Sequence, residues 1–231
     1  MSLFDCGLDY GQDIFRNIPS IKDSQHLFDD LSSDPQNWEA ANQIDIATHT
    51  ELRNSSIIQR AFDYSKNEFI DYPFENITAS RFNDGSFACW YGSETLETSI
   101  FETVYHLIQT INDSLEAFED EDFIDVDRKV GEIYCEGLAF DLTSKINEYP
   151  WLIDSTNYLL CQNLGKRIAQ EGHPLLRVPS ARDSAGVNLV AFNANVLSNP
   201  RNFCYLRYQL DLRTMEPIVY RGNEKYLLDL N

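Results

Sequence analysis

Basic side chains are scarce in this sequence. It contains 18 lysines and arginines against 37 aspartates and glutamates, so its formal charge at pH 7 is −19. A chain this acidic repels phosphate backbones and anionic lipid surfaces, and no local cluster of basic residues offsets the repulsion. We therefore expect neither a nucleic-acid partner nor a membrane partner.

Long apolar runs and targeting signals are missing as well. No run of about 18 apolar residues occurs, which argues against a transmembrane helix. Residues 1–6 lack the basic and apolar regions of a signal peptide. Because 43% of the residues are hydrophobic, the chain can bury a sizeable core. These features predict a folded cytoplasmic protein.

The common short motifs of metal sites and enzymes are also absent. The five cysteines are widely spaced without a C-x-x-C pair, which favours reduced thiols over a disulfide framework or a zinc site. There is no glycine-rich phosphate loop, no H-E-x-x-H and no G-x-S-x-G. Glu102 and His106 have the i, i+4 spacing of a metal pair, but two ligands are weak support for a site. We expect no metal.

The hydrophobic pattern predicts an α+β domain and not a doubly wound sheet. Residues 1–75 are expected to form a mostly helical, loop-rich N-terminal region packed on a body that spans residues 76–231. In that body one helix begins near Thr95, and a second, capped by Asp154 or Ser155, ends at Gly172. The expected helices of the N-terminal region span 24–31, 34–47 and 51–64, and the expected strands of the body span 87–91, 130–142, 175–178, 187–192 and 203–210.

An acidic segment interrupts the body. Residues 116–127 include seven acidic side chains and no basic one. Such a run is either a solvated linker or helix face, or a patch that docks a basic partner.

The helix that begins near Thr95 has two contrasting faces. At 100° per residue, one stripe collects Leu96, Ile100, Val104, Leu107, Ile108 and Ile111. Glu102 lies opposite that stripe, among the short or neutral side chains Thr98, Ser99 and His106. This setting favours the wall of a cleft for Glu102, with a surface glutamate as the alternative.

Several polar residues follow one another at distinctive spacings. Arg81 stands in S-R-F-N, Tyr91 follows ten residues later, and Glu102 follows Arg81 by twenty-one. Ser180 stands in P-S-A-R, and the sequence then continues to Gly186-x-Asn188. Over residues 77–195 this ordered set resembles the RES domain family, which is named for its Arg, Glu and Ser. Residues 158–172 also resemble the helix that precedes the serine in that family.

The resemblance implies a fold similar to that of ADP-ribosyltransferases, in which two small sheets with inserted helices flank an NAD cleft. It implies that NAD⁺ is the substrate and that the nicotinamide–ribose bond is cleaved by hydrolysis or phosphorolysis. Members of the family are typically toxins, each held inactive by an Xre-type antitoxin that covers the active site. The catalytic residues carried over by motif are Arg81, Tyr91, Glu102 and Ser180, and those that bind NAD are Arg81, Tyr91, Ser180, Arg182 and Asn188.

The chemistry of these side chains fits that role. A carboxylate such as Glu102 stabilises the positive charge that develops on ribose when nicotinamide leaves. Arg81, with Arg182 as a second contact, can hold a pyrophosphate in place of a glycine-rich loop. Tyr91 can stack on a ring and use its hydroxyl, and Ser180 can bond an amide or a ribose hydroxyl. Taken singly, the same residues also fit a surface salt bridge, core packing and a turn cap.

Two other functions remain open at this level. The cleft could transfer ADP-ribose to a protein target, or the chain could be a noncatalytic acidic module that docks a basic partner through residues 116–127. The sequence does not decide between water and phosphate as the acceptor of ADP-ribose. It also leaves open the cognate antitoxin, the role of residues 1–75 and the oligomeric state, for which a homo-oligomer is one option.

Overall fold

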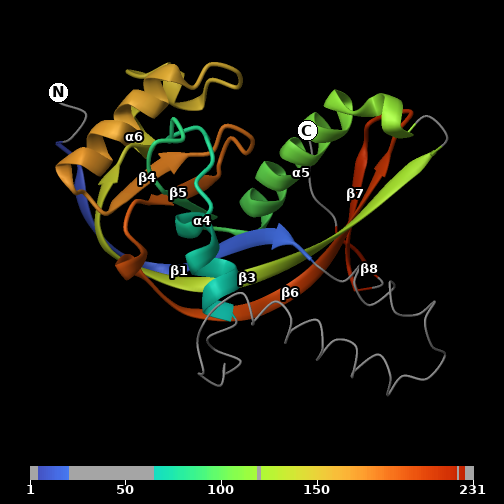
Figure 1. Cartoon of the computed structure of the whole chain (residues 1–231), viewed down its shortest axis with the longest axis horizontal. Coiled ribbons are helices and arrows are strands. Elements are labelled where there is room, and N and C mark those ends of the chain that lie inside the picture. The colour runs from blue at the N-terminus through green and yellow to red at the C-terminus, as the bar shows by residue number, and fades with distance from the viewer. Residues whose placement is uncertain (1–4, 21–64, 119–120, 223, 227–231) are drawn as a thin grey trace.

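A computed structural model describes residues 5–20, 65–118, 121–222 and 224–226. Strands dominate this part of the chain, and the fold class is α+β as predicted (Figure 1). The strands are β1 (Gly7–Pro19), β2 (Trp90–Ser93), β3 (Phe123–Asp141), β4 (Leu175–Pro179), β5 (Val187–Ala191), β6 (Leu197–Asp211), β7 (Pro217–Arg221) and β8 (Glu224–Tyr226). The α-helices are α4 (Tyr72–Glu75), α5 (Leu96–Asp113) and α6 (Leu159–Glu171), and a π-helical turn, Asn67–Asp71, leads into α4.

The strands form one hydrogen-bonded sheet in the order β1-β2-β5-β4-β3-β6-β7-β8. An additional β1–β3 pairing closes the first five strands into a ring, and β6, β7 and β8 continue outward from β3. The predicted pair of small sheets is therefore joined into a single sheet. The connection is β3, which has 19 residues and pairs with β4 in the ring through residues 139–141 and with β6 through residues 123–135.

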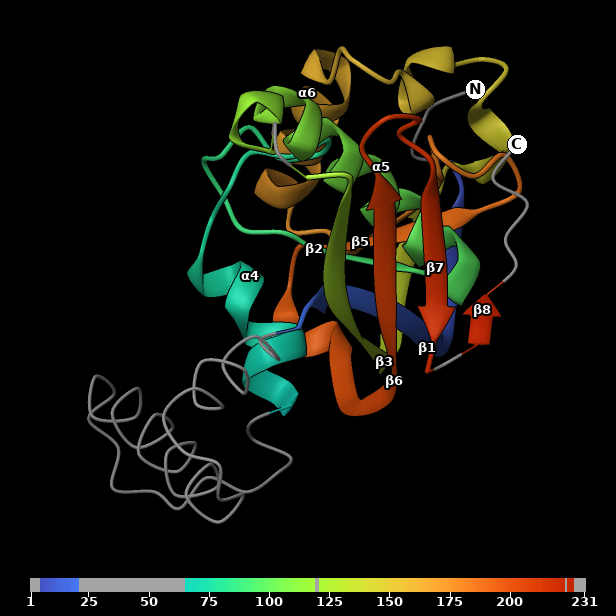
Figure 2. The ribbon, with the colours of Figure 1, turned by 90° about the vertical axis from the view of Figure 1, so that its right-hand side faces the viewer.

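Two helices cover the sheet at different places. In Figure 1, α5 and α6 lie on the same side of the long curved strands β1, β3 and β6, and Figure 2 shows β6 and β7 edge to edge. The apolar stripe of α5 packs on β3, β6 and β7 through Ile100, Val104, Val130, Leu206 and Val219. Burying one such side chain contributes about 1.5–3 kcal/mol, so this stripe fixes the rotation of α5 and directs its polar face away from the sheet.

The prediction of a helical N-terminal region is wrong for residues 7–19. They form β1, which pairs with β3 along its whole length, from Gly7↔Phe140 to Pro19↔Arg128. Tyr10 and Ile14 are buried, but the residue between them with the same strand parity is Gln12, which is exposed and donates a hydrogen bond to the Tyr10 hydroxyl. This polar residue breaks the alternation that would have indicated a strand. The three helices expected within residues 24–64 lie outside the described residues.

Other element boundaries agree better with the sequence. Thr95 caps α5, because its side chain accepts a hydrogen bond from the Thr98 amide at 3.1 Å. Helix α6 ends at Gly172, which has φ 76°, although Tyr158 precedes its first residue in place of Asp154 or Ser155. Strands β4 and β5 lie where predicted. The strand expected at residues 87–91 begins only at Trp90, and the sequence analysis missed β7 and β8.

Part of the acidic segment belongs to the sheet. From Phe123 onward it forms the start of β3, which pairs with β6. Asp127 forms an ion pair with Arg207 at 3.1 Å, and Asp125 accepts a hydrogen bond from Gln209 at 3.0 Å. These carboxylates on β3 thus already have partners within the sheet. No helix in the described residues has the length and apolarity needed to cross a lipid bilayer.

Candidate functional site

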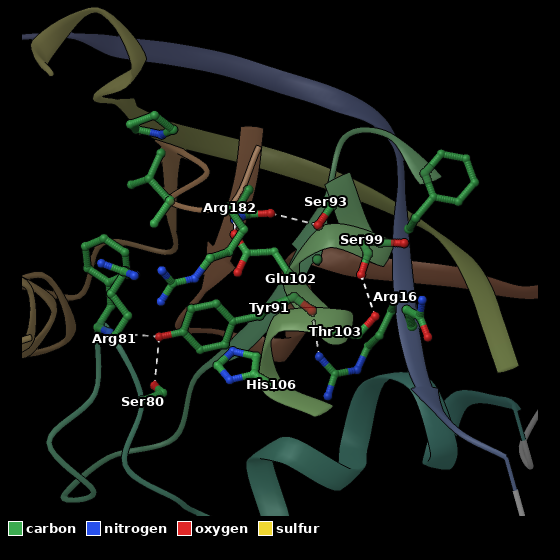
Figure 3. A pocket seen from close by; sticks show the side chains of 18 of the residues that line it. Arg16, Ser80, Arg81, Tyr91, Ser93, Ser99, Glu102, Thr103, His106 and Arg182 are labelled. Carbon is green, nitrogen blue, oxygen red and sulfur yellow. Dashed lines mark hydrogen bonds between the residues drawn. The ribbon is translucent and has the colours of Figure 1, made fainter. Parts of the chain in front are cut away.

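A cavity of about 350 Å³ lies between the polar face of α5, the end of β1, strand β2 and the segment after β4 (Figure 3). Five of the six site residues predicted from sequence line it, and Ser180 contacts one of these five, Glu102. The five are Arg81, Tyr91, Glu102, Arg182 and Asn188. Segments far apart in the sequence therefore meet at one site, as the motif spacing predicted.

Glu102 is held by neutral donors. Its Oε1 atom accepts hydrogen bonds from the Ser180 hydroxyl and from the Asn188 amide, each at 2.6 Å. Asn188 is oriented in turn by Ser93, whose hydroxyl donates to Asn188 Oδ1 at 2.7 Å. Within the described residues Glu102 has no cationic partner, and Oε2 accepts no hydrogen bond. The carboxylate is therefore fixed in orientation while its negative charge stays uncompensated.

Ser180 lies at the centre of a tight turn. Its Oγ atom accepts hydrogen bonds from the amides of Arg182 and Asp183, at 3.0 and 3.1 Å, while it donates to Glu102. Asp183 also accepts a hydrogen bond from the Thr98 hydroxyl at 2.7 Å, which ties the turn to the start of α5. A Cβ atom on Gly186 would lie 2.5 Å from the Asp183 carboxylate, so this close packing requires glycine. The serine is buried, with 4% exposure.

Arg81 and Arg182 flank the ring of Tyr158. Arg81 donates to the Asp154 carbonyl at 2.5 Å, and its guanidinium lies 4.5 Å from the centre of that ring. Arg182 donates to the Ser155 carbonyl at 3.2 Å and to the Tyr158 hydroxyl at 3.3 Å. Its guanidinium also stacks 3.4 Å from the ring centre of Tyr105, and its buried Nε has no hydrogen-bond partner in the described part of the chain. Both cations are thus held by carbonyls and aromatic rings, and neither forms an ion pair with another described residue.

Helix α6 positions the turn that carries Arg81. The Gln162 side chain donates to the Ser80 carbonyl at 3.0 Å. The helix approaches so closely that a Cβ atom on Gly165 would lie 1.9 Å from the Phe82 carbonyl oxygen. This explains why a glycine stands in the middle of α6 despite its cost to helix stability.

Tyr91 contributes its ring to the pocket lining, while its hydroxyl serves the fold. The hydroxyl accepts a hydrogen bond from the Phe82 amide at 2.9 Å and shares another with the Ser80 hydroxyl at 2.8 Å. Burial raises the pKa of this phenol well above its ordinary value. The hydroxyl that the sequence analysis offered to a ligand is therefore occupied by the Arg81 turn.

Sequence reasoning missed Arg16, which enters the pocket from β1. Its guanidinium donates to the Tyr91 carbonyl at 2.6 Å and lies 5.2 Å from the centre of the Trp90 ring. Burial, followed by the positive charge of Arg128, lowers the pKa of Arg16 to about 10. The buried Nε atom of Arg16 has no hydrogen-bond partner among the residues that the structure describes. The only feature of the sequence that could have indicated Arg16 as a site residue is that it is an arginine in a chain with few basic residues.

Arg128 lies behind this end of the pocket. It donates twice to Asn17, to the side-chain and backbone oxygens, each at 2.9 Å. Burial lowers the pKa of Arg128 below that of a solvated guanidinium. Arg16, Arg81, Arg128 and Arg182 all lack a carboxylate partner among the described residues, whereas other arginines form ion pairs with carboxylates. Those with carboxylate partners are Arg167, Arg177, Arg201, Arg207 and Arg213.

An ion-pair cluster supports the start of α5. Arg177 binds both oxygens of Glu94, at 2.6 and 2.8 Å, and also Asp141 at 3.0 Å. Glu94 directly precedes the Thr95 cap and accepts a further hydrogen bond from Tyr10 at 3.1 Å. The cluster therefore connects β1, β3 and β4 to Glu94, the residue just before the cap of the helix that bears Glu102.

His106 lies one turn beyond Glu102 on α5 and also lines the pocket. Burial by neighbouring atoms is the largest cause that lowers the pKa of this imidazole, and the charges of Arg182, Arg81 and Arg128 act in the same direction. Glu102 opposes them. No group of three metal-binding side chains comes together in the described part of the chain.

Comparisons with known proteins complete the description of the site. Residues 56–211 match the model of the RES domain, which covers more than half of the chain. No curated protein matches. Among solved structures, the chain is similar to one from the M. tuberculosis MbcT–MbcA toxin–antitoxin complex, with 12% identity and a TM-score of 0.45 over 85% of this chain and 86% of that one.

Proposed function

The chain belongs to the RES domain family, and on this premise we propose that its pocket binds NAD⁺ and cleaves the bond between nicotinamide and ribose. One observation carries the proposal. Among the described residues, Glu102 is held only by neutral donors, and it shares a cavity with three arginines that have no carboxylate partner there. Such an arrangement suits a ligand that carries negative charge at one place and develops positive charge at another.

The arginines account for binding of the pyrophosphate. In a protein with a net charge of −19, an anionic ligand is repelled from most of the surface. Arg81 and Arg182 present planar, permanently charged donors beside each other around Tyr158. Their existing partners are carbonyls and rings, so a phosphate group adds charge-assisted hydrogen bonds without first breaking an ion pair. Arg16 adds a third positive charge inside the pocket.

Glu102 accounts for the chemical step. When the bond breaks, its electron pair passes to the nicotinamide nitrogen, which leaves as a neutral ring, and positive charge develops on the ribose. Ser180 and Asn188 keep the carboxylate fixed, so little reorganisation is needed as that charge develops. The acceptor of the ADP-ribosyl group is water or phosphate.

The aromatic rings at the site supply stacking surfaces. Tyr91 and Tyr158 both line the pocket, and the ring of Tyr158 also faces the guanidinium of Arg81. Either ring can stack against a planar base, and offset stacking of this kind contributes about 0.5–1.5 kcal/mol beyond burial. The assignment of nicotinamide and adenine to the two rings is left to experiment.

We extend the proposal to biological role: the chain is a toxin, neutralised by an Xre-type antitoxin that covers this pocket. The basis is family membership, since RES proteins are typically toxins of such pairs. The chemistry agrees, because an enzyme that destroys a central cofactor requires an inhibitor in the cell that makes it. Expression of the chain alone is expected to deplete NAD⁺ and stop growth, and coexpression with the antitoxin is expected to restore both.

The direct test is a time course of the purified protein with NAD⁺, with and without phosphate, in which each product is separated and identified. Free nicotinamide with ADP-ribose indicates hydrolysis, and free nicotinamide with ADP-ribose phosphate indicates phosphorolysis. With NAD⁺ labelled in its ADP-ribose part, label attached to an added protein would indicate ADP-ribosyl transfer instead. Arg81→Ala should lose NAD⁺ binding. Unchanged NAD⁺ in the presence of folded wild-type protein would falsify the proposal.

A further inference from the structure

His106 is a pocket residue to which the account above gives no chemical role. Its imidazole is among the side chains that line the cavity (Figure 3), yet the residue is exposed. The ring contacts Tyr105 edge to face, with 5.6 Å between ring centres. Neither ring nitrogen forms a hydrogen bond within the described residues. His106 thus contacts both the pocket and solvent, and its ring nitrogens make no hydrogen bond to another described residue.

The charges around His106 come from four segments. Glu102 lies one turn earlier on α5, Arg182 follows β4, Arg81 lies on the turn before β2, and Arg128 lies on β3. Burial and the three arginines lower the pKa of His106, and Glu102 only partly compensates. The lowered pKa favours the neutral imidazole, which can accept a proton.

We propose that His106 accepts the proton of the water molecule that attacks the ribose, an inference that rests on the function proposed above. Bonds, electron pairs and the proton are all accounted for in this step. The C1′–nitrogen bond breaks and its electron pair goes to nicotinamide. The C1′–oxygen bond forms from a lone pair of the water, and the proton of that water moves to an imidazole nitrogen. The exposed side of the ring then releases the proton to solvent.

The position of His106 relative to Glu102 allows both side chains to act on the same ribose. A one-turn separation on a helix places two side chains on the same face, with about 5–6 Å between their Cβ atoms. Glu102 stabilises the sugar cation, and His106 activates the molecule that captures it. An anionic acceptor such as azide or phosphate has a nucleophilic atom without a proton, so it does not need this base.

The test compares His106→Gln with wild type in nicotinamide release. Glutamine keeps a polar side chain of similar reach but cannot accept a proton. We expect hydrolysis to fall by about a hundredfold or more in kcat, the usual contribution of general base catalysis. The KM for NAD⁺ should change by less than about threefold, since binding is not removed. Added azide or phosphate should restore much of the lost rate.

The pH profile gives a second readout. In wild type, kcat for hydrolysis should fall as the pH drops through a value below 6.5, the ordinary pKa of imidazole, because the base becomes protonated. His106→Gln should lose this part of the profile. Gln109→Ala, an exposed position on the same helix outside the pocket lining, is the matched control and should keep wild-type kinetics.

Three outcomes overturn the inference while leaving the proposed function intact. These are unchanged hydrolysis in His106→Gln, a loss that neither anion restores, and a wild-type enzyme that consumes NAD⁺ only when an anionic acceptor is present. A wild-type protein that releases no nicotinamide with any acceptor refutes the proposed function itself. Circular dichroism of each variant establishes that the comparison is between folded proteins.

Discussion

Replacing Glu102 with glutamine isolates the charge of the carboxylate from its shape. The Oε1 atom of glutamine can still accept hydrogen bonds from Ser180 and Asn188, which now hold the carboxylate oxygen at 2.6 Å. The side chain should therefore keep its orientation. What disappears is one unit of negative charge beside the ribose.

The magnitude follows from Coulomb's law. A unit charge about 4 Å from the developing cation contributes about 4 kcal/mol at an effective dielectric constant of about 20. That energy corresponds to about a thousandfold in rate. In bound NAD⁺ the positive charge is spread over the pyridinium ring, and it moves to the ribose only as the bond breaks, so ground-state binding should weaken less than turnover. We expect kcat to fall by about a hundredfold to a thousandfold with a KM close to that of wild type.

The assay is initial-rate nicotinamide release for wild type and Glu102→Gln, with NAD⁺ affinity measured by calorimetry. Asp113→Asn removes the same charge from the exposed end of α5 and is the matched control. It should behave as wild type. Turnover within about threefold of wild type in Glu102→Gln would refute the reasoning, because the charge effect worked above is far larger.

Three further predictions concern binding and stability. Arg16→Gln should raise the Kd for NAD⁺ about tenfold or more, since a hydrogen bond to a charged group contributes about 1.5–3 kcal/mol; unchanged affinity in calorimetry would remove Arg16 from the anion site. Gly165→Ala should destabilise the fold by about 3 kcal/mol or more in urea denaturation, because its Cβ meets the Phe82 carbonyl at 1.9 Å; Gly172→Ala, which meets nothing within 4 Å but has φ 76°, should cost only about 1 kcal/mol. Burial raises the pKa of Asp141, but the hydrogen bonds from Thr143 and the charge of Arg177 together lower it by more. The pKa of the folded state therefore lies below the ordinary value. The stability due to this carboxylate is present above its unfolded pKa of 3.8 and is lost as the pH falls through the lower folded value, and Asp141→Asn should flatten that acid limb in chemical denaturation.

Local patterns predicted the parts of the fold in which one signal dominates. The stripe from Leu96 to Ile111 predicted α5 because its apolar residues repeat at the helical period, and from Leu96 to Ile108 they pack with residues of β3, β6 and β7. Gly172 predicted the end of α6 because few other residues adopt its positive φ. Strand β1 was missed because only Tyr10 and Ile14 are buried in it, and the exposed Gln12 between them interrupts the apolar alternation of a strand.

The candidate site shows a similar division. The resemblance to the RES family implied that Arg81, Tyr91, Glu102, Arg182 and Asn188 belong to one site, and they line one cavity. Arg16 was missed since its place in the pocket depends on the pairing of β1 with β3, which are far apart in the sequence.

Contacts within the site were even less accessible to sequence reasoning. Tyr158 was included only as part of a helix, whereas the structure places its ring against Arg81 and its hydroxyl against Arg182. The hydroxyl of Tyr91 was offered to a ligand, but it bonds the Arg81 turn. Such partners are decided by tertiary packing, which residue spacing does not describe.

A crystal structure of Glu102→Gln with NAD⁺ bound tests the central claim most directly, because the variant should bind the substrate without consuming it. We predict the pyrophosphate against Arg81 and Arg182, with the nicotinamide ribose beside residue 102. NAD⁺ seated on another surface, or in this cavity with its pyrophosphate away from both arginines, would contradict the account.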